Sequence, residues 1–138
     1  MLRVNKKLEY GVIALLYLAS DSDKVASVRE MSEVCHVPEA LLSKVMQRLK
    51  SKGFVLATHG NHGGYQLGKN LAEINLLDLT HALVGPVMVA ECLEAGNETC
   101  PAKASCTIVT PMSLLNEKII RLFEGTSLES LVSRKATL

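Results

Sequence analysis

The apolar positions of the first twenty residues repeat at helical spacing, which predicts a buried first helix. Its inward residues are expected to be Leu8, Val12, Leu15, Leu16 and Ala19. Early positive charges followed by an apolar run also match the layout of a secretory signal peptide. That run is too short to span a bilayer, and the elements that follow need this helix as a packing partner. We therefore favour a folded first helix in a cytoplasmic protein that has no membrane partner.

A second, shorter helix is predicted to begin at Ser27. Ser27 and Glu30 have the spacing of a capping box, in which each side chain bonds the backbone N–H of the other residue. The inward positions of this helix are expected to be Val28, Met31 and Val34. A tight break follows in the sequence CHVPEA, residues 35–40, so the chain is expected to turn there.

A third helix is predicted to start at Pro38, as its first residue, and to stop at Gly53 in the left-handed conformation. Its inward residues are expected to be Leu41, Leu42, Val45, Met46 and Leu49. Its outer face is expected to carry Glu39, Ser43, Lys44, Gln47, Arg48, Lys50 and Lys52. Two short helices with a tight turn, the second basic on its outer face, indicate a helix-turn-helix. An ordinary helical hairpin with a solvated face has the same pattern.

The stretch GFVLATHGNHGGYQLGK, residues 53–69, sets short apolar runs on either side of a glycine-rich tip, which predicts a β-hairpin. A hairpin directly after a recognition helix is a wing. Its glycines allow the backbone to approach a phosphate or enter a minor groove, with His59 and Lys69 nearby as donors. His59 and His62 also suggest zinc, but no cysteine or acidic cluster lies at matching spacing, so we favour neutral hydrogen-bonding residues at the tip.

A long helix is predicted to begin between Thr107 and Thr110 and to end before Gly125, with Pro111 in its first turn. Its apolar positions alternate steps of four and three residues, which is typical of a coiled-coil seam that needs a partner helix. The seam residues, and so the expected dimer interface, are Ile108, Met112, Leu115, Ile119 and Leu122. Packing of this helix on its own chain alone is the alternative.

Two further short helices are predicted. One begins after its cap Asn75, with His81 at the surface and an inward face made of Leu76, Leu79 and Leu83. The other begins at a capping box formed by Thr126 and Glu129 and continues to about Arg134.

Composition and charge agree with a nucleic-acid-binding domain. Of the 138 residues, 48% are apolar and 21% charged, which suffices for a core of ordinary size. Residues 1–70 carry ten Lys and Arg against six Asp and Glu, a net charge of +4, and residues 71–138 carry five against eight, a net charge of −3. The first half is therefore suited to approach an anion. No Ser-His-Asp set, phosphate loop or dinucleotide motif occurs, so we expect no enzyme.

The segment ECLEAGNETCPAKASC, residues 91–106, places three cysteines in a loop that is poor in large apolar residues. Thiolates are the usual ligands of iron–sulfur clusters, and the small residues Ala95, Gly96 and Ala102 allow the loop to fold its sulfurs around one object. A disulfide of a thiol sensor and a cysteine-rich zinc site are the alternatives. Cys35, on the first helix of the helix-turn-helix, is expected to be a small buried thiol instead.

Nearly the whole chain resembles the Rrf2 family of bacterial winged-helix regulators. The resemblance rests on the motif EYGV (residues 9–12), the helix-turn-helix, the wing sequence GNHGGYQLGK (residues 60–69) and the cysteine-rich loop before a long helix. That family includes regulators of iron–sulfur cluster assembly, iron-responsive repressors, nitric-oxide-sensing repressors and members that lack a cluster. The resemblance implies that Cys92, Cys100 and Cys106 ligate an iron–sulfur cluster, with 4Fe–4S favoured over 2Fe–2S.

The cysteine spacing departs from that of some relatives. The pattern here is C-x(7)-C-x(5)-C, whereas the assembly regulators have a shorter first gap and a histidine three residues after the last cysteine. This chain has Val109 there, which cannot bind iron. The longer first gap is more similar to that of the iron-responsive repressors.

The resemblance also implies a fourth ligand from the partner subunit. In the nitric-oxide-sensing relatives an aspartate of the first helix reaches the partner's cluster, and Glu9, directly before Tyr10, occupies the matching place. A carboxylate is a harder ligand than a thiolate, so an iron held by it would be the easiest to lose. An ion pair of Glu9 with Lys6 or Lys7 is the alternative. Glu91, Glu94 and Glu98 are rival ligands within the loop.

The sequence therefore predicts a fold that is mainly α with a small β wing. We expect a winged helix-turn-helix domain in residues 1–85, a cluster loop in residues 86–106, and a dimerisation helix with a C-terminal helix in residues 107–138. The function expected is that of a homodimeric regulator that binds a pseudo-palindromic operator in double-stranded DNA and is controlled by its cluster. A cluster-free thiol or metal sensor of the same fold and a protein-binding adaptor are the alternatives.

The expected DNA contacts come from the third helix and the wing. Ser43 and Lys44 are expected to reach bases, and Gln47, Arg48 and the wing to reach phosphates. The full set is Pro38, Glu39, Ala40, Ser43, Lys44, Gln47, Arg48, His59, Gly60, Asn61, His62, Gly63, Gly64 and Tyr65.

Overall fold

Helices make up most of the fold, and the part of the chain that the structure describes also contains one two-stranded antiparallel sheet. The structure is a computed structural model that describes residues 3–94, 96 and 98–133. In chain order the elements are α1 (Lys6–Leu18), α2 (Val28–Cys35), α3 (Glu39–Ser51), β1 (Val55–Thr58), β2 (Gly64–Leu67), η1 (Leu71–Glu73), α4 (Leu76–Leu83), η2 (Glu91–Leu93), η3 (Lys103–Ser105), α5 (Val109–Glu124) and α6 (Leu128–Ser133). The predicted fold class, mainly α with a small β wing, is confirmed.

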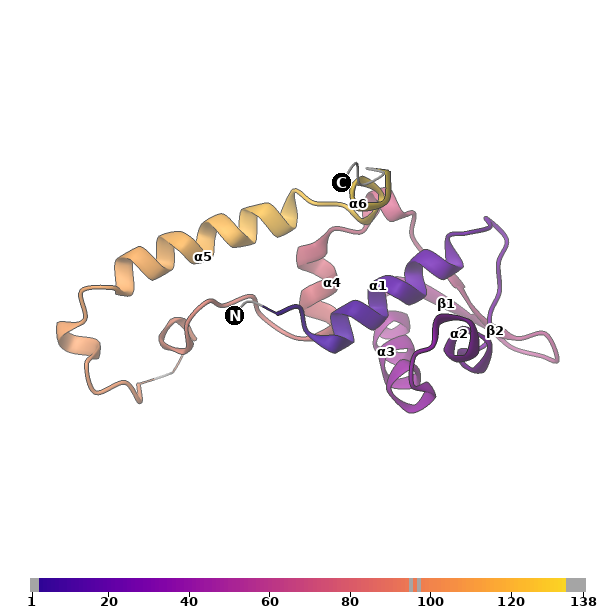
Figure 1. Ribbon diagram of the computed structural model, residues 1–138, viewed down its shortest axis with the longest axis horizontal. Helices are drawn as coiled ribbons and strands as arrows, with labels where there is room; N and C mark the ends of the chain where they lie inside the picture. Colours follow the sequence, from indigo (N-terminus) through magenta and orange to yellow (C-terminus); the bar gives the residue numbers. More distant parts are fainter. Residues whose placement is uncertain (1–2, 95, 97, 134–138) are drawn as a thin grey trace.

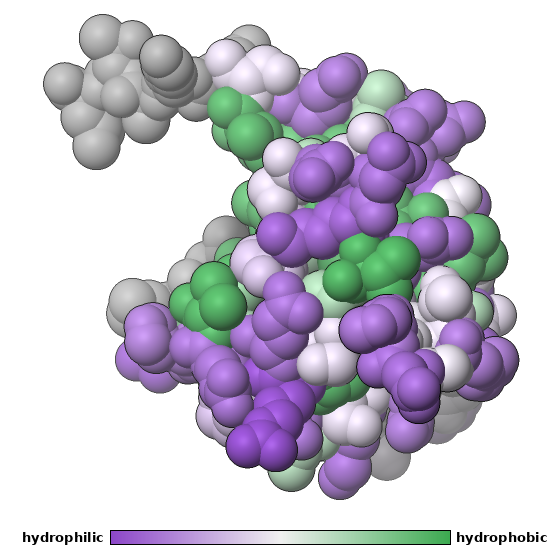
Figure 2. All heavy atoms as spheres, turned by 90° about the vertical axis from the view of Figure 1, so that its right-hand side faces the viewer, coloured by the Kyte–Doolittle hydropathy of each residue, from purple (hydrophilic) through white to green (hydrophobic). Residues whose placement is uncertain are grey.

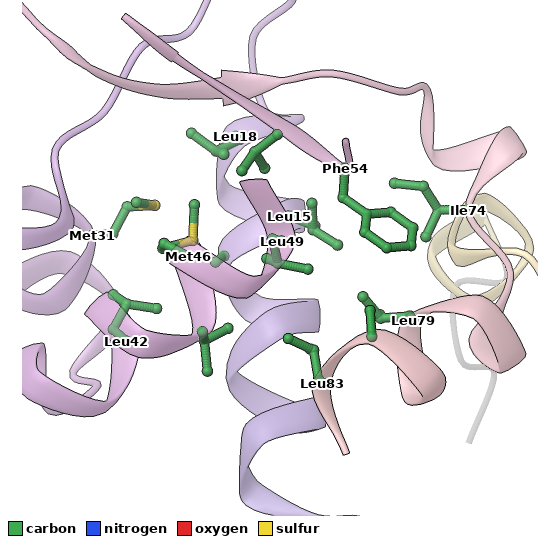
Figure 3. Close-up of a cluster of buried hydrophobic side chains, with 14 of the residues drawn as sticks. Leu15, Leu18, Met31, Leu42, Met46, Leu49, Phe54, Ile74, Leu79 and Leu83 are labelled. Atoms are coloured by element: carbon green, nitrogen blue, oxygen red, sulfur yellow. The ribbon is translucent and has the colours of Figure 1, made fainter. Parts of the chain in front are cut away.

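Helix α1 packs against α2, α3, α4 and β2 and so lies in the middle of the helical body (Figure 1). Leu15 and Leu18 of α1 are essentially inaccessible to solvent. Around them gather Met46 and Leu49 of α3 and other apolar side chains (Figure 3). Burial of these side chains is the main force that holds helix α3 in place.

The face of α1 that enters the core is rotated from the predicted one. Leu8 and Leu15 are buried as expected, but Val12, Leu16 and Ala19 are only half-buried. Their places in the core are taken by the small residues Gly11 and Ala14 and by Leu18, the last residue of the helix. A glycine and an alanine in this stripe let neighbouring helices approach closely, a feature that apolar periodicity does not reveal.

The caps of α2 and α3 follow the sequence signals in part. The side chain of Ser27 accepts a hydrogen bond from the Glu30 backbone N–H at 3.1 Å. The return half of the predicted capping box is absent, because the Glu30 carboxylate accepts a hydrogen bond from the Tyr17 hydroxyl at 2.7 Å. That bond to a carboxylate raises the pKa of Tyr17. Pro38 is the residue before α3 and not its first helical residue.

Two residues predicted to point inward are exposed. Val34 of α2 is 56% exposed and Leu41 of α3 is 46% exposed. Each lies at the edge of the apolar stripe of its helix, where no neighbouring helix of the same chain covers it. Leu42, Val45, Met46 and Leu49 are buried as predicted, and Gly53 has the predicted left-handed φ, at 76°.

The predicted hairpin is present, and a third segment of chain adds to it. Val55 pairs with Leu67, and Thr58 with Gly64, in an antiparallel register. Ala26, just before α2, also bridges to Tyr65, with backbone bonds of 2.9 and 2.8 Å in the two directions. The wing is therefore bound to the start of the helix-turn-helix as well as to α3.

Two wing glycines have a packing role that the sequence did not indicate. A Cβ on Gly64 would overlap the backbone carbonyl of Ala26, and a Cβ on Gly63 would overlap that of Thr58. Neither glycine has a positive φ, so the requirement is for space and not for an unusual backbone conformation. Gly60, at the tip, is the wing residue that does adopt a positive φ, of 117°.

The second half of the chain leaves the body and returns to it. Helix α5 and the segment between α4 and α5 extend away from the other helices (Figure 1). The chain then comes back: the Leu76 backbone N–H bonds the Thr126 carbonyl at 2.9 Å, and Leu128 is fully buried in the common core. The predicted division of the chain into three segments, with boundaries after residues 85 and 106, stays a prediction. The core nevertheless includes Leu128, which belongs to the third of these segments.

The start of the terminal helix differs from the prediction. Ser127, not Thr126, caps α6, because the side chain of Ser127 accepts from the Ser130 backbone N–H at 3.1 Å. The Thr126 hydroxyl instead donates to the Leu122 carbonyl at 2.6 Å. Arg134, the predicted end of this helix, lies outside the described residues. Asn75 caps α4 as predicted, with a 2.8 Å bond from the Asp78 backbone N–H. In the part of the chain that is described, no helix is long and apolar enough to cross a membrane.

We expect Gly64→Ala to lower the free energy of unfolding by about 1–3 kcal/mol, since the added methyl has to displace backbone at Ala26. Chemical denaturation followed by circular dichroism measures this loss. The control is Asn61→Ala at the exposed tip of the same hairpin, which should change stability by about 0.5 kcal/mol or less. Equal stability of Gly64→Ala and the unmodified protein would contradict the packing role.

Candidate DNA-reading surface and cysteine loop

The turn between α2 and α3 is fixed by local hydrogen bonds. His36 adopts the left-handed conformation, with φ of 55°, which ends α2. The Ser32 hydroxyl donates to the Val37 carbonyl at 2.6 Å, and the Val37 backbone N–H donates to the Ser32 carbonyl at 3.2 Å. Val37 is buried, so the turn is anchored in the core and sets the angle at which α3 leaves it.

The outer face of α3 is available to a ligand along its length. Pro38, Glu39 and Ala40 at the front are exposed, and so are Lys44, Gln47 and Arg48 further along, whereas Ser43 is half-buried. Leu41 adds an apolar side chain to this face. A helix with exposed polar and basic side chains that projects from a rigid turn has the form of a recognition helix.

The tip of the wing is exposed to solvent, and its base is partly buried. His59, Gly60, Asn61 and His62 are exposed, while Gly63, Gly64 and Tyr65 are half-buried. Tyr65 packs against the core and its backbone is engaged by Ala26, so its side chain has a structural role whatever it contributes to DNA binding. Seen from the end that bears α2 and the wing, the surface is mostly hydrophilic with small apolar areas between (Figure 2).

The cations of the reading surface are unpaired. Exposed ion pairs join Lys6 to Glu9, Arg29 to Glu33 and Lys103 to Glu98. Lys44 and Arg48 belong to none of them. Exposed cations without internal partners are available to phosphates, which is the electrostatic requirement for binding DNA.

The three loop cysteines are free, half-buried thiols. Cys92 lies within η2, Cys100 precedes the turn that leads to η3, and Cys106 directly follows η3. Cys35, the last residue of α2, is also half-buried and not fully buried as predicted, but it packs against the core, and this partial burial raises the pKa of its thiol. Cys35 therefore lies among the helices of the body, apart in the chain from the loop thiols.

Asn116 of α5 holds the start of the cysteine loop. Its side-chain oxygen accepts a hydrogen bond from the Val89 backbone N–H at 3.0 Å, across 27 positions of sequence. Val89 precedes Cys92 by three residues, and η2 also contacts α5. Sequence reasoning missed Asn116, because one polar residue in a helix has no periodic signal. The loop and α5 are thus joined by a specific contact.

The loop thiols have the right donor chemistry for an iron–sulfur cluster but are not gathered in this structure. Within the described residues, no group of three or more His, Cys, Asp or Glu side chains is arranged to hold a metal ion. His59 and His62, the alternative zinc ligands, therefore belong to no such group of described residues. Ala95, which was expected to help the loop fold inward, lies outside the described residues.

Glu9 forms the ion pair that was its alternative role. Its carboxylate lies 2.6 Å from Lys6 Nζ, and its side chain is 37% exposed. The hydrogen bond to the carboxylate raises the pKa of Lys6. A single chain does not test ligation across subunits, so Glu9 as a ligand stays a prediction.

Helix α5 has no buried residue, which fits a helix that lacks its partner. Of the predicted seam, Ile108, Leu115 and Leu122 are 57%, 44% and 64% exposed, and Met112 and Ile119 are half-buried. Leu114, which the seam did not include, is 55% exposed as well. A strict heptad pattern therefore underestimates the apolar face of this helix.

The turn, the exposed helix and the wing together define the class: a winged helix-turn-helix transcriptional regulator. Within that class, a model of the Rrf2 family, described as an iron-dependent transcriptional regulator, matches residues 4–134. The chain belongs to the Rrf2 family. It is a DNA-binding transcriptional regulator and not an enzyme.

Similar proteins cover nearly the whole chain. Protein aau3 of Rhizobium meliloti (strain 1021) is 28% identical over 134 residues, which are 97% of this chain and 87% of that protein. The structure of CymR (YrzC), the global cysteine regulator of B. subtilis, is similar at 25% identity with a TM-score of 0.73, covering 96% of this chain and 98% of that one. The structure of T. potens IscR, at 20% identity with a TM-score of 0.70 and coverage of 99% and 92%, shares the fold.

Lys44→Ala should weaken binding to a specific operator by about 1–3 kcal/mol if Lys44 reads a guanine. The operator is first selected from a pool of random duplexes, and affinities for it and for random DNA are then measured by fluorescence anisotropy. Lys118→Ala, on the exposed surface of α5, is the control for the loss of one positive charge. An equal loss on operator and random DNA would make Lys44 a phosphate contact.

Proposed function

We propose that this chain is a homodimeric transcriptional regulator of cytoplasmic location whose affinity for DNA is controlled by an iron–sulfur cluster held by Cys92, Cys100 and Cys106. The observation that carries the proposal is the set of three free thiols in one loop that is bonded to α5 through Asn116. The iron-dependent character of the family supports it. When bound, the cluster would supply sensitivity to iron, redox state or nitric oxide. A 4Fe–4S cluster is favoured over 2Fe–2S.

The dimer is proposed to form through α5. Exposed apolar side chains occur at its start, its middle and near its end: Ile108, Leu114, Leu115 and Leu122. Exposed apolar surface of this extent on one helix needs a covering partner, and a second α5 is self-complementary under two-fold symmetry. Such a dimer would carry two α3 helices to successive major grooves of a pseudo-palindromic operator, about 34 Å apart. The wing tips would then lie near the flanking minor grooves.

Signal transfer is proposed to use contacts between packed elements. The loop is bonded to α5, α5 packs on α4, and α4 packs on both α1 and α3. A change in the order of the loop would alter the position of α5, and through α4 that of the reading helix. Coupling of this kind requires that the ligated loop favour one of two arrangements of the dimer.

A cluster-free thiol sensor is the second candidate. It is favoured by the half-buried, free state of the loop thiols and by the similarity to CymR, a global cysteine regulator. In that case a disulfide or thiol modification in the loop would act on the same α5 contact. The adaptor hypothesis has no comparable support, because the unpaired cations of α3 suit a polyanion.

Anaerobic purification with iron and sulfide analysis separates the two candidates. Cluster binding predicts visible absorption, and Cys100→Ala should abolish it, since a cluster with few protein ligands has none to spare. Cys35→Ala is the matched control and should keep the colour, because Cys35 lies on α2 in the body. A colourless anaerobic protein, or a fully coloured Cys100→Ala protein, would rule out the cluster hypothesis.

Glu9 is proposed as the fourth ligand, donated to the loop of the partner subunit. Glu9→Ala should leave the dimer intact and make the cluster labile. The decisive experiment mixes a Glu9→Ala chain with a Cys106→Ala chain, because ligation across subunits then leaves one complete composite site in each heterodimer. Normal dimerisation without that site would favour a ligand from the same loop.

A further inference from the structure

A groove of about 550 Å³ lies between the first turn of α1 and the outer face of α3. Its lining includes Tyr10 and Leu41 together with four cations: Lys6, Lys7, Lys44 and Arg48. Of the described residues that line the groove, none is acidic. Two of its cations, Lys44 and Arg48, belong to the recognition helix, and the other two come from an element outside the helix-turn-helix.

The positive charge of the groove is largely uncompensated. Lys6 is paired with Glu9, at 2.6 Å, but no ion pair among the described residues involves Lys7, Lys44 or Arg48. The groove also borders the N-terminal end of α1, where the helix dipole adds partial positive charge. Several like charges around one hollow raise the local potential and attract an anion.

The position of these cations points to one extended anion. Lys44 and Arg48 are expected DNA contacts of α3, so a DNA backbone that passes α3 as proposed would continue over the groove toward α1. A compact anion would need fewer cations. An α5 helix of a second copy exposes Glu117 and Glu124 together with Lys118 and Arg121, so it brings no net negative charge and would leave these cations uncompensated. Leu41, which is 46% exposed and lines the groove, suits the apolar surface of deoxyribose.

We infer that the groove between α1 and α3 holds the phosphate backbone of double-stranded DNA, and that Lys7 is a phosphate contact outside the helix-turn-helix and wing. This inference rests on the DNA binding of the proposed function and adds the N-terminal helix to the reading surface. Glu9 competes for Lys6, so Lys7 is the cation of α1 that is free to bind. Because Glu9 and Lys7 lie on the same helix turn, the proposed ligand and this contact move together.

The test is the salt dependence of binding to a duplex of random sequence, for which no operator is needed. The slope of log K against log salt concentration is about −0.9 for each phosphate neutralised, so Lys7→Ala should make the slope of a dimer less steep by about 1.8. Fluorescence anisotropy between about 50 and 200 mM salt gives the slope. Lys7→Arg should restore it, and Lys118→Ala, on α5, should leave it unchanged.

Failure of the inference can be told apart from failure of the proposed function. If Lys7→Ala keeps the full slope while Arg48→Ala, at an expected phosphate contact of α3, reduces it, the backbone does not use the groove, and DNA reading by α3 still stands. If Lys7→Ala weakens dimerisation in sedimentation experiments without a change of slope, the groove is an interface between copies and the inference is wrong. Absence of salt-dependent binding by the unmodified protein would overturn the DNA-binding proposal itself, and the inference with it.

Discussion

The fold depends on the burial of α1 among its neighbours, and where α1 approaches α4 most closely, residue 11 has no side chain. A Cβ on Gly11 would overlap the end of the Leu83 side chain, and Leu83 is only 4% exposed. At this separation α1 can bury Leu15 and Leu18 while it contacts α2, α3 and β2 as well. The orientation of the reading helix therefore rests on contacts made by a helix that precedes it in the chain.

The two halves of the molecule satisfy different physical demands. The body has an apolar core that is covered by elements of the same chain. Leu128, from the C-terminal helix α6, is part of this core. Helix α5 has apolar side chains but no buried residue. A helix of this kind gains little stabilisation from its own chain, which supports the proposed dimer. The net positive charge is in the first half of the chain, and its cations include those on the outer face of α3 and at the start of α1.

The cysteine loop lies between these two parts and is connected to both. Asn116 bonds the loop to α5, and the loop begins where α4 ends. A loop with few buried side chains has several conformations of similar free energy, and a ligand that binds one of them shifts the population. The body, in contrast, has a continuous buried core, which suits the proposed transfer of a displacement through α4. If the loop binds a ligand as proposed, its attachment to the DNA-binding body is a physical basis for regulation.

Short-range signals in the sequence determined the elements and much of the candidate surface. Helix limits followed from residues such as Ser27, Asn75 and Gly53, because caps and left-handed stops depend on the residue itself and its near neighbours. The exposed outer face of α3 and the exposed seam of α5 followed from apolar periodicity. The three cysteines were evident from composition and spacing alone.

Tertiary structure decided which side of each element is covered and which neighbours compete for a side chain. Val34 and Leu41 are exposed because no neighbouring element covers the edge of their stripes, and periodicity does not specify how wide a covering neighbour is. Glu30 bonds Tyr17 and not its expected local partner, since a residue thirteen positions away is closer in space. Gly64 is required by the close approach of the Ala26 backbone, and Gly11 lies against the end of the Leu83 side chain. The groove between α1 and α3 arises in the same way: its cations are nearly forty residues apart in sequence, and only packing of the two helices brings their charges around one hollow.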